Sequence, residues 1–246
     1  MWELLVLLVV IAVVHWWEYS TSVQEYTFAQ PADHDDLSRV LQEKTPIALE
    51  VGSLPWRPEV AGKASWFVDS APIQQWLADR APIKDKAGLA EQMGLTTGLT
   101  DLDMGRPWWW LPELRDAQVD ILQGVVGLSW VSAERHWIGC SHGEPLTLWL
   151  THSRYRKFLP GSGHGSGSVN PWTLTVAEAP WIGRVQYIEV TVKPGWCIGL
   201  PAHWGFAIRT LSTENSESWI WSAEQHSMFS FTLNLPVHKI LNMLDS

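Results

Sequence analysis

The first residues of the chain form its longest uninterrupted apolar pattern. Residues 4–14 read LLVLLVVIAVV, without a polar side chain. Trp2 precedes this run, and Trp16, Trp17 and Tyr19 follow it. Tryptophan and tyrosine collect at both interfaces of a bilayer. The pattern therefore predicts a transmembrane helix with a collar formed by these four aromatic residues.

The predicted anchor covers residues 2–17, and a polar spacer follows at 18–24. At about 1.5 Å per residue the anchor would be roughly 24 Å long, which suits a thin internal membrane better than the roughly 30 Å core of an average bilayer. A cleaved signal peptide is a weaker interpretation because Glu3 stands where a basic residue is expected. A buried helix is weaker too, because it would normally keep one polar face.

Downstream, the pattern predicts an α+β domain that is mainly β. Residues 33–44 combine an acidic first turn with one apolar face, which predicts a helix, and residues 47–51 predict a strand. Short β-like runs then follow at the spacing of a barrel or sandwich. These predicted strands are residues 125–131, 135–140, 146–151, 185–192, 196–200, 206–211 and 228–233.

One of these runs has a clear two-residue period. Ile188, Val190 and Val192 alternate with polar residues, so they are predicted to face the core. Pro194 and Gly195 follow directly and predict a turn into the next strand.

Composition limits the classes of function. Of 246 residues, 46% are hydrophobic and 17% charged, which predicts a packed core. Asp and Glu outnumber Lys and Arg by 26 to 17, so no nucleic-acid partner is expected. Cys140 and Cys197 lack the spacing of a zinc site and are expected to be partly buried thiols. Most of the 18 tryptophans are expected in the core.

The most specific pattern lies in the second half of the chain. Residues 187–206 read YIEVTVKPGWCIGLPAHWGF, in which a strand leads through Pro194 and Gly195 into a second strand and then a corner at Pro201 and Trp204. This segment resembles the closing half of cupin-like (JmjC-like) domains.

A second segment narrows the resemblance. Residues 168–172, SVNPW, resemble in particular the membrane-anchored cupin-like proteins of large DNA viruses. The resemblance implies a double-stranded β-helix, which is a jelly-roll barrel, with flanking helices. It covers about residues 25–235, and it predicts a cupin-like domain at residues 25–246 with the barrel core at about 123–235.

The resemblance also implies where a metal would lie. Active members of the family hold Fe(II) with a His-x-Asp pair and a distal His, and they bind 2-oxoglutarate beside it. When Gly143 is placed on the family's strand-connecting glycine, these positions fall on Trp130, Ser132 and Phe206. None of these residues can act as the metal ligand that the family has at the corresponding position. The resemblance thus implies a degenerate site with no metal, no cofactor and no catalytic residue.

Three further histidines leave an alternative open. His136, His142 and His203 lie in or beside the β-region and are the fallback ligands if a metal is bound. Packed or surface histidines explain them more simply, because a metal site needs three converging ligands. His34 opens a His-Asp-Asp run, but this run begins a predicted helix, where capping explains it.

Three hypotheses of function follow. The first is a non-catalytic, single-pass, membrane-anchored cupin-like protein that is structural or binds another protein at a host internal membrane or virion membrane, with membrane lipid as its partner. The second is an Fe(II)/2-oxoglutarate-dependent oxygenase with a displaced metal site. The third is a module that binds carbohydrate or lipid headgroups through exposed tryptophans.

Overall fold

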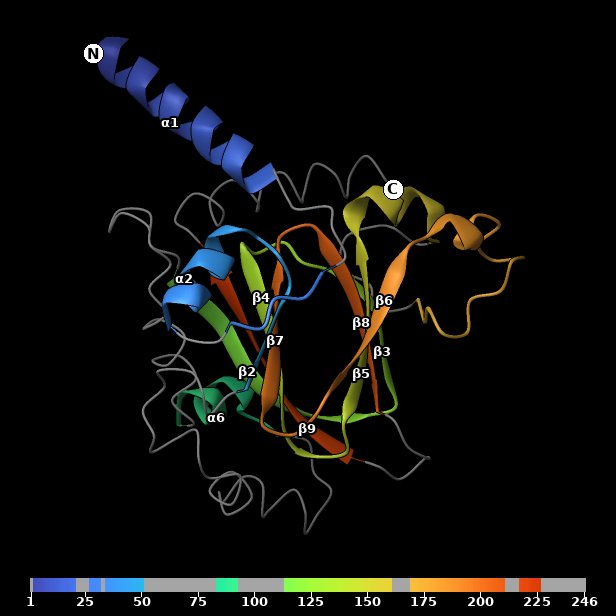
Figure 1. Cartoon of the computed structure of the whole chain (residues 1–246). Helices are drawn as coiled ribbons and strands as arrows, with labels where there is room; N and C mark the ends of the chain where they lie inside the picture. Colours follow the sequence, from blue (N-terminus) through green and yellow to red (C-terminus); the bar gives the residue numbers. More distant parts are fainter. Residues whose placement is uncertain are drawn as a thin grey trace.

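The fold is seen in a computed structural model, which describes residues 2–20, 27–31, 34–50, 83–92, 113–160, 169–210 and 217–226. Within these ranges the chain is mainly β, with two antiparallel sheets packed face to face and helices at their periphery (Figure 1). The predicted fold class is confirmed at this level.

The larger sheet has five strands in the order β1-β7-β4-β9-β2. The smaller sheet has four strands in the order β3-β8-β5-β6. From β2 onward, successive strands alternate between the sheets except at the β5–β6 pair, an arrangement that is consistent with a jelly-roll sandwich. The strands are β1 (Ile47–Glu50), β2 (Glu113–Gln123), β3 (Val125–Trp130), β4 (Arg135–Gly143), β5 (Leu146–His152), β6 (Tyr187–Val192), β7 (Trp196–Pro201), β8 (Trp204–Thr210) and β9 (Glu217–His226).

Most of the predicted elements within the described residues are confirmed. The helix at 33–44 is α2 (His34–Gln42), the strand at 47–51 is β1, and six of the later strands correspond to β3 through β8. The predicted strand at 228–233 lies outside the described residues. Two strands were not predicted, namely β2 and β9. β2 begins at Glu113, ahead of the expected barrel core, and pairs with β9.

The space between the two sheets is filled by apolar side chains, which we call the interior cluster. β6 shows how the sequence builds it: Ile188, Val190 and Val192 pack into this cluster, while Glu189 and Thr191 are exposed. The predicted alternation is therefore confirmed. The buried members are Leu122, Val131, Ala133, Ile138, Cys140, Leu146, Leu148, Leu150, Val192, Ile198, Leu200, Trp204, Phe206 and Ile208.

A second cluster, the helix-side cluster, joins the outer face of the five-stranded sheet to α2 and α6 (Lys86–Gln92). Tryptophans dominate it: Trp137, Trp219 and Trp221 are buried here, and the Trp137 indole donates a 2.9 Å hydrogen bond to Gln225. Gly139 makes room for one of them, because a Cβ at this position would lie 2.1 Å from the Trp221 ring. The expectation that tryptophans serve the core is confirmed at these positions.

The N-terminal helix stands apart from both clusters. Helix α1 (Trp2–Ser20) projects away from the sandwich, and large apolar side chains along it are exposed, including Leu4 at 66%, Leu7 at 58% and Val13 at 60% (Figure 1). The predicted N-terminal helix is thus present. Among the residues that the structure describes, no helix has both the length and the apolar character needed to cross a membrane.

Candidate functional site

Polar side chains enter the otherwise apolar interior at one end of the sandwich. His136 lies on β4, on the face that also carries Ile138 and Cys140, and those two residues belong to the interior cluster. Glu224 and His226 lie on β9 and share the face of Ile220, which packs against the same cluster. Because β4 and β9 are neighbours, with His136 opposite Glu224, the three side chains meet.

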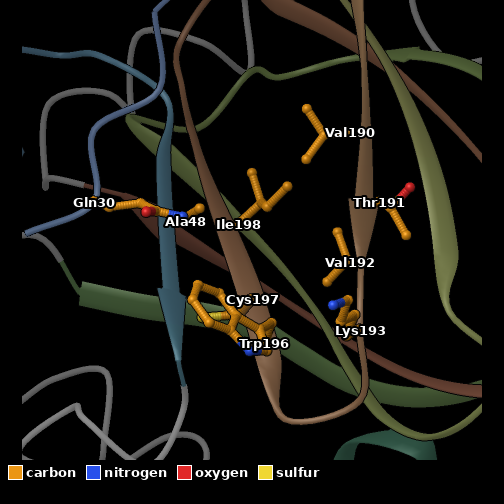
Figure 2. Close-up of a pocket in the computed structure, with 9 residues that line it drawn as sticks. All are labelled: Gln30, Ala48, Val190, Thr191, Val192, Lys193, Trp196, Cys197 and Ile198. Carbon is orange, nitrogen blue, oxygen red and sulfur yellow. The ribbon is translucent and has the colours of Figure 1, made fainter.

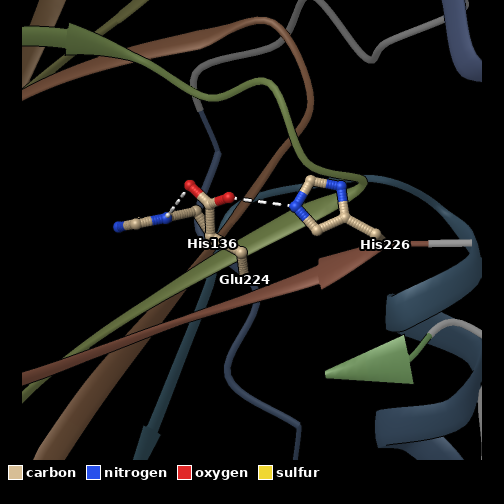
Figure 3. Close-up of polar contacts among 3 residues, drawn as sticks. All are labelled: His136, Glu224 and His226. Atoms are coloured by element: carbon tan, nitrogen blue, oxygen red, sulfur yellow. Dashed lines mark hydrogen bonds and ion pairs between the residues drawn. The ribbon is translucent and has the colours of Figure 1, made fainter. Parts of the chain in front are cut away.

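Glu224 sits between the two imidazoles, as Figure 3 shows. Nδ1 of His136 lies 3.2 Å from one carboxylate oxygen, and Nε2 of His226 lies 2.9 Å from the other. The exposed fractions are 12% for His136, 27% for Glu224 and 8% for His226. We call these three residues the His-Glu-His chain.

The carboxylate of this chain stays ionised well into the acid range. Burial alone would raise the pKa of Glu224, but hydrogen bonds from His136 and His226, together with their charge, outweigh burial and hold the pKa well below its ordinary value. Both imidazoles then act as donors through the nitrogens that face Glu224. The chain is therefore a buried, hydrogen-bonded polar network that can hold protons but uses its polar atoms largely on itself.

Aromatic rings close the chain on its inner side. Phe206, on β8 of the opposite sheet, stacks on the His136 ring at a centroid distance of 4.9 Å. Trp204, two residues before Phe206 on β8, is fully buried. Its ring meets the His152 ring edge-on at a centroid distance of 5.8 Å. This end of the interior thus combines imidazoles with aromatic surfaces.

A further histidine, His152, lies next to Trp204 at the end of β5. Burial, and then the charges of Arg154 and His203, lower the pKa of His152 to about 4. Its Nδ1 accepts a hydrogen bond from the backbone N–H of Arg154 at 3.2 Å, as a neutral ring can. His152 is therefore a neutral, structural histidine at pH 7 that caps the segment after β5.

A separate pocket of about 300 Å³ opens where the two sheets diverge (Figure 2). One wall is β6, the other consists of β7 and β1, and apolar side chains such as Val190 and Ile198 line it. Polar groups occur at Gln30, Thr191 and Lys193. Among the described residues that line this pocket, no cluster of titratable side chains points into it.

The positions aligned with the family's metal ligands separate in the structure. Phe206 faces the interior, as expected. Trp130 packs on the outer cluster, the apolar group on the far side of the four-stranded sheet, with Arg156 5.4 Å from its ring, and Val131 faces inward instead. Ser132 is half-buried just after β3. A register that gives Trp130 an inward ligand position is therefore wrong by one residue, and neither Val131 nor Phe206 has an atom that ligates a metal.

The fallback set His136, His142 and His203 is not assembled either. His136 and His142 are six positions apart on one strand, about 20 Å at roughly 3.3 Å per residue, and His142 is exposed. His203 lies in the β7–β8 turn with a φ of 68°. Over the described ranges, no group of three or more His, Cys, Asp or Glu side chains is arranged to hold a metal ion.

The two cysteines are more buried than expected. Both are at 0% exposure, and burial, partly offset by a backbone hydrogen bond from His142, raises the pKa of Cys140 to about 12. Burial also raises the pKa of Cys197. Neither thiol is a nucleophile at neutral pH, because the thiolate is the reactive form.

Sequence reasoning missed two members of the His-Glu-His chain. Glu224 and His226 lie two positions apart, a spacing that puts both on one face of a strand, but β9 itself was not predicted. It also overlooked His142-Gly143-Glu144, a second sequence in which a carboxylate follows a histidine by two positions. Gly143 has a φ of 93° there, and all three residues are exposed, while Pro145 after them is half-buried. This run therefore belongs to the turn between β4 and β5.

The predicted corner residues lie at the two ends of β7 and at the start of β8. Gly195, in the turn before β7, has a φ of 85°, and Pro201 ends β7 ahead of Trp204 on β8. Of the collar residues, Trp2 and Trp17 are 76% and 71% exposed on α1.

The sequence matches no protein-family model and no curated protein significantly.

Proposed function

We propose that this chain is a non-catalytic, cupin-like protein that is attached to a membrane by α1 and acts there as a structural or partner-binding domain. The observation that carries the proposal is the exposure of α1. Leu4, Leu5, Leu7, Val9, Val10, Val13 and Val14 are all more than half exposed on a helix that projects from the sandwich. A lipid phase is the environment in which such a surface is stable.

The pattern of exposure favours insertion over lying flat on the surface. Leu5 and Leu7 point to opposite sides of the helix axis, because they are two residues apart at roughly 100° per residue, and both are exposed. A helix that lies in the interface would keep a strongly polar face. The apolar run at 4–14 is about 16 Å long at about 1.5 Å per residue, so it fits one leaflet or a thin bilayer.

The inward-facing side chains support the non-catalytic part of the proposal. The cupin-like active site implied by the resemblance needs two imidazoles and a carboxylate converging on open metal positions. Here Phe206 occupies the inward position that the resemblance gives to the distal histidine. The imidazoles and the carboxylate nearest to Phe206 hydrogen-bond to one another. These residues do not fit Fe(II), so no reaction step is derived for this interior.

Vesicle flotation of the full chain tests the attachment. Native protein should float with phosphatidylcholine vesicles, and Val10→Asp should remain in the dense fraction. A central Asp costs about 3 kcal/mol in a membrane helix, which corresponds to more than about a hundredfold in partition. Val125→Asp is the matched control, because Val125 is also exposed, at 44%, but lies on the sandwich. Equal flotation of Val10→Asp and native protein would overturn the attachment.

Metal analysis tests the non-catalytic part separately. After equilibration with Fe(II) and dialysis, the protein should retain no stoichiometric iron. Retention of one iron per chain that disappears in Glu224→Gln would instead establish a metal site in the His-Glu-His chain and favour the oxygenase hypothesis.

A further inference from the structure

We propose that the surface formed by η3 (Ser153–Phe158) and η4 (Ile182–Arg184) rests on anionic lipid headgroups when α1 is inserted. This inference rests on the proposed membrane attachment and adds both the face that meets the membrane and the lipid chemistry. We call this surface the basic-aromatic surface; its members are Arg154, Tyr155, Lys157, Trp181 and Arg184.

The charge of this surface is opposite to that of the chain. The segments SRYRKF and IGR contain four basic residues and no acidic residue. The whole chain has 26 acidic and 17 basic residues. Lys157 and Arg184 are exposed, so their charges reach the solvent. A positive region on an acidic protein is a specific feature that electrostatics directs toward an anionic partner.

Aromatic groups accompany these charges. Trp181 is 53% exposed, and the Arg184 guanidinium lies 4.4 Å from the centroid of its ring. Nζ of Lys157 lies 5.1 Å from the Phe158 ring. Exposed indoles beside cationic side chains are typical of the membrane interface, because the ring enters the headgroup layer while the charge stays with phosphate.

The two segments are held together as one surface. Gln186, two residues after the end of η4, accepts hydrogen bonds from Arg154 at 3.3 Å and from the Tyr155 hydroxyl at 3.1 Å. The nearest acidic residues in sequence are engaged with other groups: Glu178 with Thr175, and Glu189 with the Trp172 indole. The positive charge is therefore built on a defined scaffold rather than on a loose tail.

The position of this surface in the fold favours a membrane over a soluble anion. In Figure 1, the yellow and orange turns of η3 and η4 lie at the end of the sandwich from which α1 leaves. When α1 is in a bilayer, this end of the sandwich faces the headgroups. Basic residues near an anionic surface each strengthen attachment about fivefold at moderate salt.

The test measures partition of the full chain onto two vesicle compositions, phosphatidylcholine alone and phosphatidylcholine with roughly a third phosphatidylserine. Native protein should bind the anionic vesicles about tenfold or more tightly than the neutral ones, and salt well above physiological concentration should remove the difference. Lys157→Glu/Arg184→Glu should lose the difference and keep its binding to neutral vesicles.

Lys84→Glu/Lys193→Glu is the matched control. It changes the net charge equally at exposed lysines on other parts of the fold, beside α6 and in the β6–β7 turn. It should retain the preference for anionic vesicles. An equal loss in the control, or no preference in the native protein, would overturn the proposed surface while α1-dependent binding to neutral vesicles still stands. Absence of binding to either composition would overturn the attachment and this inference together.

Discussion

Helices α1 and α2 of this chain place their apolar side chains in opposite environments. In α2 (His34–Gln42) the apolar residues Leu37, Val40 and Leu41 share one face and are buried against the five-stranded sheet. In α1 (Trp2–Ser20) large apolar residues occur on all sides and are exposed. The sheet provides α2 with the partner that stabilises a short helix, whereas the described protein provides α1 with no comparable apolar surface.

This contrast explains why we assign lipid as the environment of α1. A polar face lets α2 meet the protein on one side and water on the other. The same requirement fails for α1, because its apolar run has no polar side to present to water. We therefore expect α2 to be stabilised by the sheet and water, and α1 by lipid. Each prediction below distinguishes the behaviour of α1 from that of the sandwich.

The largest effect is expected from truncating one leucine in each helix. Leu41→Ala should lower the free energy of unfolding of the sandwich by about 3 kcal/mol, because Leu41 is 1% exposed in the helix-side cluster. Leu7→Ala should change it by less than about 0.5 kcal/mol, because Leu7 is exposed. Urea denaturation followed by far-UV circular dichroism measures both. A comparable loss for Leu7→Ala would show that α1 packs on the sandwich.

The next largest effect is expected from acid, which should destabilise the sandwich and leave the attachment by α1 unchanged. Unfolded chain protonates His152 near its ordinary pKa of 6.5, whereas the native state protonates it only near 4, so stability is lost as pH falls through this window. Between pH 7 and pH 5 this loss should be about 2 kcal/mol. His152→Asn keeps an acceptor for the Arg154 N–H and should remove most of the slope.

Urea denaturation at a series of pH values measures that slope. Flotation on neutral vesicles should not change over the same range, because α1 attaches by apolar contact. The assignment of the acid sensitivity to His152 fails if the His152→Asn slope equals that of the native protein.

The smallest effect is expected in the His-Glu-His chain. Glu224→Gln should lower the free energy of unfolding by about 1 kcal/mol at pH 7, because an amide accepts from only one of the two imidazoles through its oxygen. Since the native pKa of Glu224 is depressed, its contribution is present above the ordinary value near 4.5 and is lost as pH falls below it. The variant should therefore have a flatter unfolding profile below pH 4.5; an unchanged profile would exclude Glu224 as the source.

The sequence predicted strands best where one face meets water. β6 alternates apolar and exposed residues, so its period was visible. β9 is buried on both sides: Trp219 and Trp221 pack toward the helices, while Ile220 faces the interior. No polar and apolar alternation remains in such a strand, and it was missed.

The side of the sheet on which Trp130 lies was missed for a related reason. Because side chains alternate faces along a strand, an error of one residue moved Trp130 from the outer face to an inward ligand position. The carboxylate partner of His136 lies about ninety positions away on β9 and is brought next to it only by strand pairing. Spacing along the chain carries no signal of that kind.

The most direct test of lipid as the environment of α1 uses one fluorophore at two positions. Both native cysteines are fully buried, so a polarity-sensitive thiol label should attach selectively to Leu7→Cys on α1 or to Arg39→Cys on the exposed side of α2. With phosphatidylcholine vesicles, the label at position 7 should shift to the blue and be quenched by spin-labelled lipid, while the label at position 39 should remain unchanged. Equal, water-like emission at the two positions would contradict the assignment.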